Sequence, residues 1–402
     1  MNDTNLQSIA GHAPRARSAV RALAPSKIRE VSNASLGNPD VLPFWFGEPD
    51  EVTPEFVRRA AIESLEAGET FYSHNHGIPE LRAALASYAT RLHRPTAAEN
   101  ISVSSSGVSA LMLATQLLVG PGDRVVEVTP LWPNLVEMPK ILGAQVRTVA
   151  LEFSRQGWRL DLQKLLDALT PGTRALYVNS PNNPTGWTVS RAEQHAILEH
   201  CRRLGIWIVA DDAYERLYFG DERGVAPSFL DIADADDLVL TTNTFSKNWL
   251  MTGWRLGWLV VPKEVAPDLA KLIEYNTSCA PVFVQRAGIA AVTHGEPVIA
   301  RTLGRYRGAR DLLVERLSAI PGVDVAVPAG AMYLFFRVQG AGDSLAFCKR
   351  LVREAGLGLA PGAAFGPEGE GFVRWCFAAT EERLEEGVRR LKRGLGVEAR
   401  SA

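Results

Sequence analysis

One lysine and one arginine stand eight residues apart in the stretch TFSKNWLMTGWRLGW, residues 244–258. Lys247 follows a run of apolar and hydroxyl residues that is typical of a buried strand, and Arg255 lies among glycines and aromatic residues. An ammonium group at the end of a buried strand is costly, and desolvation lowers its pKa toward that of a nucleophilic amine. The stretch therefore indicates a lysine that reacts with a ligand.

Polar side chains also gather at other predicted strand ends. In open α/β sheets the carboxyl ends of the strands form the ligand crevice. Each of these segments taken singly is typical of a turn or a helix cap, but their convergence on one sheet edge favours a site. The segments are Ser104–Gly107, Asn182–Gly186, Asp211–Tyr214 and Thr244–Lys247.

The group of residues suits a ligand with an anionic end and a cationic ring. Free N–H groups and the dipole of a helix can hold a phosphate at the helix start, here Ser106, Gly107 and Val108. More donors to the same phosphate come from Thr244, Ser246 and Arg255. A phosphate-bearing aldehyde with a protonated ring nitrogen would satisfy these groups, a strand-end carboxylate and Lys247 together. We therefore predict pyridoxal 5′-phosphate (PLP) as the cofactor and Lys247 as its Schiff-base lysine.

The elements that must position these residues alternate between short apolar strands and helices. Near-continuous apolar strands are typical of a parallel sheet that is buried on both faces. Such strands are expected at 124–130, 145–151, 174–181, 206–214 and 238–247, and 255–262 is the candidate for an antiparallel one. Helices are expected at 109–119, 160–170 and 191–205. This alternation predicts an open α/β sheet with helices on both faces.

After about residue 285 the pattern changes to long charged helices. Helices are expected at 298–320, at 343–356 and from 381 onward, with a strand-like segment at 323–338. This pattern predicts a second, smaller α+β domain. The expected division is an N-terminal arm with the first part of the small domain (1–45), a large domain (46–290) and a small C-terminal domain (291–402).

Composition narrows the class of protein. The 402 residues are 46% hydrophobic and 22% charged with a net charge of -2, which argues against a nucleic-acid partner. No run of about eighteen apolar residues is present, so no membrane span is expected. The four cysteines are widely spaced, which indicates reduced thiols in a cytoplasmic protein and no metal site. The Ala- and Arg-rich segment 11–27 faintly resembles a transit peptide, but an arm that docks at 25–28 is the favoured interpretation.

Six motifs carry a resemblance to a known family: SPNNPTG, DDAYERLYF, TFSKNWLMTGWRLGW, FYSHNHGIPELR, PGAAFGP and VRWCFA. The chain resembles the fold-type I PLP-dependent aminotransferases of class I/II, from Pro25 to the last helix. The bacterial branch with aspartate, aromatic and kynurenine aminotransferases is the most similar. The resemblance implies a mostly parallel seven-stranded sheet in the large domain. It also implies ping-pong transfer of the amino group of an L-amino acid to a 2-oxo acid.

The resemblance assigns roles to residues around the cofactor ring. Lys247 matches the Schiff-base lysine, whose freed amine moves a proton between the substrate and the cofactor. Asp211 matches the carboxylate that keeps the pyridine nitrogen protonated, and the Asp-x-Ala-Tyr pattern selects it over Asp212. Tyr214 and Asn183 match the groups that hydrogen-bond the ring 3′-oxygen.

Further matches concern the ends of the cofactor and the substrate. Trp132 matches the aromatic residue stacked on the ring, and Arg255 matches the phosphate-binding arginine. Arg374 matches the arginine that grips the substrate α-carboxylate, and Gly47 lies in the backbone segment that lines the substrate side. Gly253 and Gly257 are expected to let the backbone pass close to the phosphate end.

Tyr72 implies a partner subunit. It matches the tyrosine that reaches the phosphate of the neighbouring subunit, so the resemblance implies an obligate homodimer. The chain departs from the family at Ser106, where glycine is commoner. It also departs at His74 and His76. These histidines could line the substrate mouth, but the favoured interpretation is that they are ordinary loop residues.

Three questions stay open at this level. A PLP-dependent β-lyase of the same fold would use the same lysine and aspartate. A PLP-binding regulatory module is a weaker alternative, because no basic helix-turn-helix arm precedes the fold. Aspartate, aromatic and aliphatic donors all remain candidates, since the family motifs assign no arginine here to a second substrate carboxylate.

Overall fold

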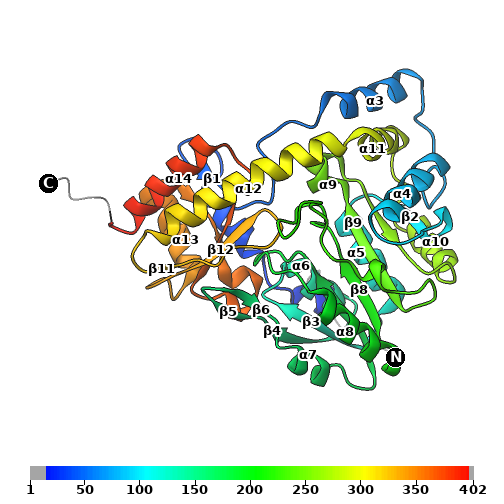
Figure 1. Cartoon of the computed structure of the whole chain (residues 1–402), viewed down its shortest axis with the longest axis horizontal. Coiled ribbons are helices and arrows are strands. Elements are labelled where there is room, and N and C mark those ends of the chain that lie inside the picture. Colours follow the sequence, from blue (N-terminus) through cyan, green and yellow to red (C-terminus); the bar gives the residue numbers. More distant parts are fainter. Residues whose placement is uncertain (1–14, 398–402) are drawn as a thin grey trace, which may run out of the picture.

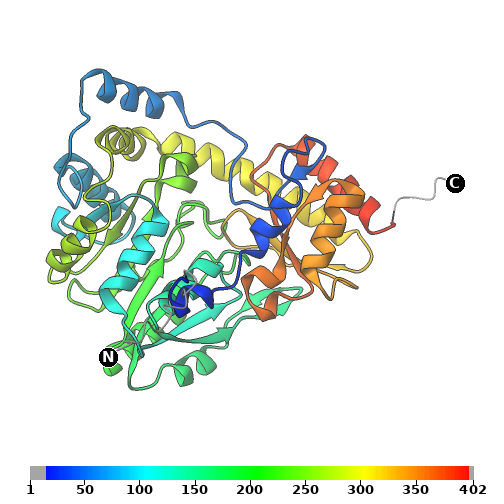
Figure 2. The same cartoon turned by 180° about the vertical axis from the view of Figure 1, so that it is seen from behind.

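The computed structural model describes residues 15–397, so the expected N-terminal arm lies partly outside the described residues, in 1–14. Figures 1 and 2 show a larger body built on a twisted sheet and a smaller body beside it. The long helix α12 (Glu296–Ser318) runs from one body to the other.

A seven-stranded sheet forms the centre of the larger body. Its strand order is β2-β10-β9-β8-β7-β3-β4, and β10 is antiparallel to both of its neighbours while the pairs from β9 to β4 are parallel. This arrangement confirms the predicted α/β class and the mostly parallel seven-stranded sheet. The strands are β2 (Ile101–Ser104), β3 (Arg124–Thr129), β4 (Gln145–Ala150), β7 (Thr173–Asn179), β8 (Trp207–Asp211), β9 (Val239–Thr244) and β10 (Gly257–Val260).

Helices cover both faces of this sheet, because its central strands are apolar on both sides. One face packs against α5 (Gly107–Leu118), α6 (Pro133–Ile141) and α10 (Ala266–Glu274). The opposite face packs against α7 (Leu162–Ala168) and α8 (Arg191–Leu204). A further apolar cluster joins β2 and β10 to α3 (Glu55–Glu66), α4 (Pro79–Leu92) and α11 (Val282–His294).

The smaller body is built on an antiparallel sheet of order β11-β12-β15-β14. The strands are β11 (Val323–Asp324), β12 (Tyr333–Val338), β14 (Ala360–Pro361) and β15 (Phe372–Cys376), and the helices are α13 (Ser344–Ala355) and α14 (Glu381–Gly394). The chain start adds α1 (Ser18–Arg21), α2 (Lys27–Asn33) and β1 (Leu42–Pro43), which pairs in parallel with β13 (Leu357–Gly358). Short 3-10 turns are η1 (Ala98–Asn100), η2 (Phe229–Asp231), η3 (Thr252–Trp254), η4 (Gly362–Phe365) and η5 (Pro367–Gly369).

Helix α12 belongs to the cores of both bodies. Ile299 near its start packs in the cluster with α3, α4 and α11, whereas Tyr306 and Leu313 pack in the core of the smaller body. Ile28 and Val31 of α2 lie in that second core as well, as does Val41 just before β1. The domain limits at 45/46 and 290/291 stay a prediction, because Ile299 packs with the larger body although it follows residue 290.

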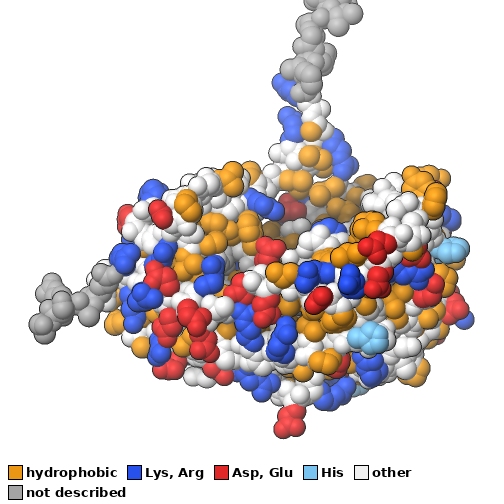
Figure 3. Space-filling view, turned by 90° about the horizontal axis from the view of Figure 1, so that it is seen from above, with side chains coloured by type: hydrophobic (Ala, Val, Ile, Leu, Met, Phe, Trp, Pro, Cys, Tyr) orange, Lys and Arg blue, Asp and Glu red, His pale blue; other side chains and the backbone are white. Residues whose placement is uncertain are grey.

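Some elements differ from the expectation. The segment 323–338 is two strands separated by a loop, and the hairpin of β5 (Glu152–Ser154) and β6 (Gly157–Arg159) was not predicted. Within residues 15–397, none of the helices combines the length and the apolar character needed to cross a bilayer. On the face shown in Figure 3, acidic and basic side chains are mixed over the surface.

Candidate active site

A cavity of about 480 Å³ opens at the carboxyl ends of β7, β8 and β9, where the two bodies meet. Twelve of the fourteen predicted site residues line it: Gly47, Gly107, Val108, Trp132, Asn183, Asp211, Tyr214, Thr244, Ser246, Lys247, Arg255 and Arg374. Ser106 lies immediately beside the lining, as the cap of α5. Tyr72 lies elsewhere on this chain.

Lys247 projects into the cavity from α9 (Phe245–Asn248), the short helix that follows β9. Its Nζ atom donates a hydrogen bond of 2.5 Å to the carbonyl oxygen of Gly47 and lies 5.9 Å from the centre of the Tyr214 ring. Burial lowers the pKa of the Lys247 ammonium to about 8, and the positive charges of Arg374 and Arg255 act in the same direction. With this pKa about a tenth of the amine is neutral and nucleophilic at pH 7, far more than for an ordinary lysine.

Asp211 ends β8 and faces the same cavity. Its carboxylate accepts hydrogen bonds from Asn179 Nδ2 at 3.1 Å and from Thr242 Oγ1 at 3.4 Å. Burial raises the pKa of the Asp211 carboxyl to about 7, against the opposing effects of the Ala213 N–H, the Thr242 hydroxyl and the positive charge of Lys247. A cationic group brought into the cavity would offset that burial cost and favour the carboxylate form.

Asp212 points to a different environment. Its Oδ2 atom accepts a hydrogen bond of 2.8 Å from Ser228 Oγ, and the residue is absent from the cavity lining. Successive residues of a strand point to opposite faces, so only one of the two aspartates can face the cavity. The geometry supports Asp211, and not Asp212, as the aspartate that contacts a ligand in the cavity.

The start of α5 has the close packing expected around a bound phosphate. A Cβ atom at Gly107 would lie 2.9 Å from Thr244 Cβ, and one at Gly257 would lie 2.5 Å from the Gly107 nitrogen. Ser106 caps α5 with φ of 136°, a conformation that favours glycine, and its hydroxyl accepts from the Ser109 N–H at 3.0 Å. The serine thus occupies a glycine-type conformation, which explains why glycine is commoner here.

Gly253 differs from Gly257 in its surroundings. A Cβ atom there would meet nothing within 4 Å, so no close backbone approach requires glycine at this position. The sequence pattern could not separate Gly253 from Gly257, because both flank Arg255 closely and only the three-dimensional packing distinguishes them.

Hydroxyl groups and Arg255 complete the same end of the cavity. Thr244 Oγ1 donates to Ser246 Oγ at 2.9 Å and accepts from the Ser246 N–H at 3.1 Å. Arg255 is exposed, and its Nη1 atom donates to the Thr252 carbonyl oxygen at 2.6 Å. The donors at this end can therefore converge on an anion while the guanidinium reaches it from the protein surface.

Arg374 lies on β15 and is buried, with 2% of its surface exposed. Its Nη1 atom donates to Asn183 Oδ1 at 2.8 Å, and its guanidinium stands 4.3 Å above the centre of the Tyr333 ring. Its Nη2 atom donates to the Trp45 carbonyl oxygen, and its Nε atom has no hydrogen-bond partner among residues 15–397. A buried guanidinium with an unused donor is suited to bind a carboxylate that enters the cavity.

Tyr333, Asn179 and Arg29 line the cavity but were missed in the sequence. The Tyr333 hydroxyl is 2.8 Å from that of Tyr214, and a Cβ atom at Gly47 would overlap it. Tyr333 comes from a strand of the smaller body, so no pattern within the α/β region could indicate it. Asn179 immediately precedes the SPNNPTG motif, and that position was the available signal.

Tyr72 lies away from the cavity, with 91% of its surface exposed. It shares a surface hollow with His74, Phe71 and Val282. The His76 Nδ1 atom lies 2.8 Å from Ser102 Oγ, on β2. Neither histidine lines the cavity of this chain, in keeping with the favoured interpretation as loop residues.

Comparisons with known proteins identify the family. The model of the family "Aminotransferase class I and II" matches residues 39–391, so the chain belongs to that family. A probable aspartate/prephenate aminotransferase of Aquifex aeolicus is 35% identical over 364 residues, which cover 89% of this chain and 91% of that protein. An aspartate aminotransferase of Pyrococcus horikoshii is 33% identical and covers 92% of this chain and 94% of its own length. The protein is a PLP-dependent aminotransferase.

The fold comparison agrees with the sequence comparison. The structure of an aspartate aminotransferase from Thermus thermophilus with maleate matches with a TM-score of 0.88 and 32% identity. The match covers 95% of this chain and all of that one. The chain therefore has the fold-type I architecture along almost its whole length.

The residues of the cavity fit PLP. A glycine-lined helix start, two hydroxyl groups and an exposed arginine form an anionic-group site at one end. A buried carboxylate and a lysine with a lowered pKa line the same cavity, as does Arg374. These groups thus match the phosphate, the ring nitrogen and the aldehyde carbon of PLP. Arg374 is then available to bind the carboxylate of a substrate.

Proposed function

We propose that Lys247 is the amine that binds PLP and that moves the proton during amino transfer. The observation that carries this proposal is that Lys247 and Asp211 face one cavity from the ends of the neighbouring strands β9 and β8. When bound, the cofactor supplies an electron sink. With the cofactor in place, the Lys247 amine, neutral in part near pH 8, would be the base that takes the proton from the substrate Cα.

The other lining residues bind and orient. The Asp211 carboxylate holds a proton on the pyridine nitrogen, and Asn179 fixes the orientation of that carboxylate through its hydrogen bond. Tyr214 and Asn183 line the cavity and would hold the 3′-oxygen of the cofactor, and Trp132 would hold the ring face. The phosphate is bound by Ser106, Gly107, Val108, Thr244, Ser246 and Arg255.

At the substrate end, Arg374 binds the α-carboxylate with its fork of donors. Its bonds to Asn183 and to the backbone of Trp45 fix the guanidinium before substrate arrives, and the backbone of Gly47 lines the same side. The Tyr333 ring, whose centre is 4.3 Å from the guanidinium carbon, adds a cation–π contact that favours this position of the arginine.

The site is proposed to be completed in a homodimer. Phe71 and Tyr72 are both large and exposed, at 82% and 91%, and adjacent exposed aromatic residues are typical of an interface. Arg255, at the phosphate end, is exposed as well, so a residue of a second copy has access to that end. Tyr72 of a partner subunit would then reach the phosphate.

We further propose that the donor is a dicarboxylic amino acid. Arg29 of α2 lines the cavity and stacks on Phe46, with its guanidinium carbon 4.9 Å from the ring centre. It has no acidic partner within residues 15–397, whereas the proposal above assigns Lys247, Arg255 and Arg374 to cofactor and α-carboxylate. An unpaired arginine at the mouth suits a second carboxylate, and several relatives are named aspartate aminotransferases.

The experiment is a panel of amino donors with 2-oxoglutarate and pyruvate as acceptors. Aspartate and glutamate should have a higher kcat/KM than alanine, leucine or phenylalanine. Arg29→Gln should lower kcat/KM for the dicarboxylic donors about tenfold to a hundredfold and change the others little. Arg21→Gln, at an exposed arginine of α1 outside the lining, serves as the matched control. Equal losses for every donor, or a parent enzyme that prefers neutral donors, would contradict the substrate assignment and leave the transaminase assignment intact.

A further inference from the structure

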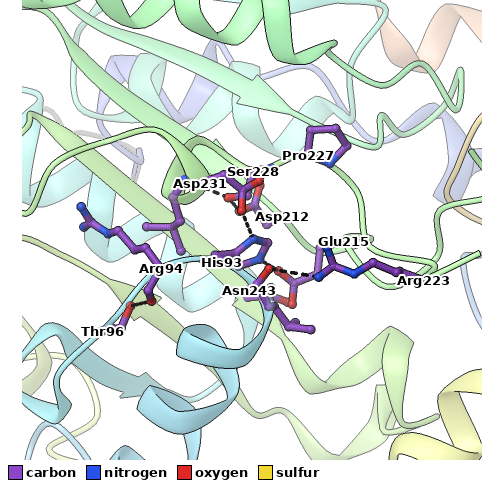
Figure 4. Close-up of polar contacts among 12 residues, drawn as sticks. His93, Arg94, Thr96, Asp212, Glu215, Arg223, Pro227, Ser228, Asp231 and Asn243 are labelled. Carbon is purple, nitrogen blue, oxygen red and sulfur yellow. Dashed lines mark hydrogen bonds and ion pairs between the residues drawn. The ribbon is translucent and has the colours of Figure 1, made fainter. Parts of the chain in front are cut away.

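A closed circuit of hydrogen bonds lies around the turn that follows β8 (Figure 4). The turn begins at Asp212 and ends at Glu215, whose backbone N–H donates to the Asp212 carbonyl oxygen at 2.9 Å. Tyr214, which faces the cavity, stands between these two residues. The position of its hydroxyl therefore depends on how firmly both ends of the turn are held.

The first end of the turn is held by Ser228. Ser228 Oγ donates to the Asp212 carboxylate at 2.8 Å, and the Ser228 backbone N–H donates to Asp231 Oδ2 at 2.9 Å. Arg191 adds a bond of 2.5 Å to the same oxygen of Asp231. This side of the circuit thus connects the start of the turn to the short helix η2.

The second end of the turn is held by His93. Its Nε2 atom lies 3.1 Å from Glu215 Oε2, and its Nδ1 atom lies 2.8 Å from Asp231 Oδ1. The imidazole therefore closes the circuit, because it joins the end of the turn to the acid that already holds Ser228. His93 follows the last residue of α4, where a positive charge also interacts favourably with the helix dipole.

The imidazole is both buried and charged. Its side chain is 2% exposed, and those of Glu215 and Asp231 are 5% and 18% exposed. Burial lowers the pKa of His93, but the two carboxylates outweigh it and raise that pKa to about 10. A protonated ring can donate from both nitrogens at once, which a neutral ring cannot do.

We propose that His93 is a positioning residue for amino transfer: by joining Glu215 to Asp231 it fixes the turn that presents Tyr214 to the cofactor. His93 is absent from the cavity lining, so it acts through the turn and touches neither substrate nor cofactor. The inference rests on the proposed role of Tyr214. A side chain misplaced by a fraction of an ångström in such a site costs rate even when the fold is intact.

The test compares His93→Asn with the parent enzyme. Asparagine is shorter and uncharged, and cannot join both carboxylates. We expect kcat to fall about tenfold to a hundredfold while KM for the amino donor stays within about twofold. In the apoprotein, the backbone amides of residues 212–217 should exchange hydrogen faster than in the parent. The midpoint of the pH titration of the visible absorbance of the holoenzyme should shift in the same direction as in Tyr214→Phe.

A double-mutant cycle separates positioning from simple stabilisation. If His93 acts through Tyr214, the variant with both His93→Asn and Tyr214→Phe should be no slower than Tyr214→Phe alone. Ser228→Ala opens the circuit at Asp212 but leaves His93 between Glu215 and Asp231. It should therefore change kcat and the absorbance titration in the same direction by a smaller amount. This variant replaces His93→Asn if the latter does not fold. His200→Asn, at a histidine of α8 that bonds the Leu169 carbonyl oxygen, is the matched control and should change none of these readouts.

Two results would overturn the inference. One is a lowered melting temperature with kcat and the absorbance titration unchanged, in His93→Asn or, if that variant is unfolded, in Ser228→Ala. The other is a double variant whose rate loss is the product of the two single losses. If Tyr214→Phe itself has no effect, the proposed role of Tyr214 fails instead, while the amide exchange of the turn still reports whether His93 fixes it.

Discussion

Lys247 and Asp211 face one cavity from neighbouring strands, and burial moves their pKa values toward each other. The lysine pKa falls to about 8 and the aspartate pKa rises to about 7. Both buried groups therefore carry a charge only at a cost in desolvation free energy. A cationic ring nitrogen would offset this cost at Asp211, and reaction with an aldehyde would remove the buried ammonium of Lys247. This relationship leads to the following expectations.

The first prediction concerns the two adjacent aspartates. Asp211→Asn should slow amino transfer at least about tenfold, and up to about a hundredfold, since an amide loses the charged hydrogen bond to the ring nitrogen. Asp212→Asn should change the rate much less, because its carboxylate bonds Ser228 outside the cavity. Single-turnover kinetics with one amino donor measure both effects. If the two variants exchanged these behaviours, the assignment of the strand end would be wrong.

The second prediction concerns pH. Only the neutral amine of Lys247 can attack the cofactor aldehyde, and its pKa is lowered to about 8. The rate at which PLP combines with the apoprotein should therefore rise with pH, reach half of its maximum near pH 8 and level off about one unit higher. The rate for Nα-acetyl-lysine, measured in the same buffers, should keep rising toward pH 10 and corrects for ionisation of PLP itself. A protein profile parallel to that of the free amine would show that burial does not activate Lys247.

The third prediction concerns Arg374. Replacement by alanine should weaken amino-donor binding about tenfold to a hundredfold, as expected for a charge-assisted pair. Arg374→Lys should recover only part of this, because it keeps the charge but lacks the fork. All donors should be affected alike, since they share the α-carboxylate, whereas Arg29→Gln should separate them by side chain. An Arg374 variant that rejects one donor and accepts the others normally would show that this arginine reads the side chain.

The fourth prediction concerns the shared site. Tyr72→Phe and Lys247→Ala chains are each expected to be impaired. Mixed dimers would hold one site with both changes and one site with neither, so part of the activity should return after subunit exchange. Sedimentation of the parent protein provides the control for a dimer. Without any recovery in verified mixed dimers, Tyr72 would not belong to the site of a partner subunit.

The sequence predicted the parts of the site that follow strands of the large sheet. Lys247, Asp211 and Asn183 could be located because their motifs follow β9, β8 and β7, and parallel strands bring their carboxyl ends to one edge. Arg374 came from the family resemblance, since it lies on a separate sheet.

Other features depended on packing between distant segments. Tyr333 enters the cavity from β12, and Arg29 enters from a helix near the chain start, so neither has a local signal that connects it to the sheet. The circuit through His93 joins residues 93, 215 and 231, which no periodicity relates. The need for glycine at 257 but not at 253 likewise depends on which backbone passes nearby.

The central claim is that Lys247 carries the cofactor, and borohydride reduction tests it most directly. The holoenzyme should be yellow, borohydride should abolish the visible band, and mass spectrometry of peptides should find the reduced pyridoxyl group on Lys247. Lys247→Ala should fold with an unchanged circular dichroism spectrum and lose nearly all turnover, since the cavity lining holds no second lysine. A pyridoxyl group on another residue of the parent protein, or none at all, would contradict the account.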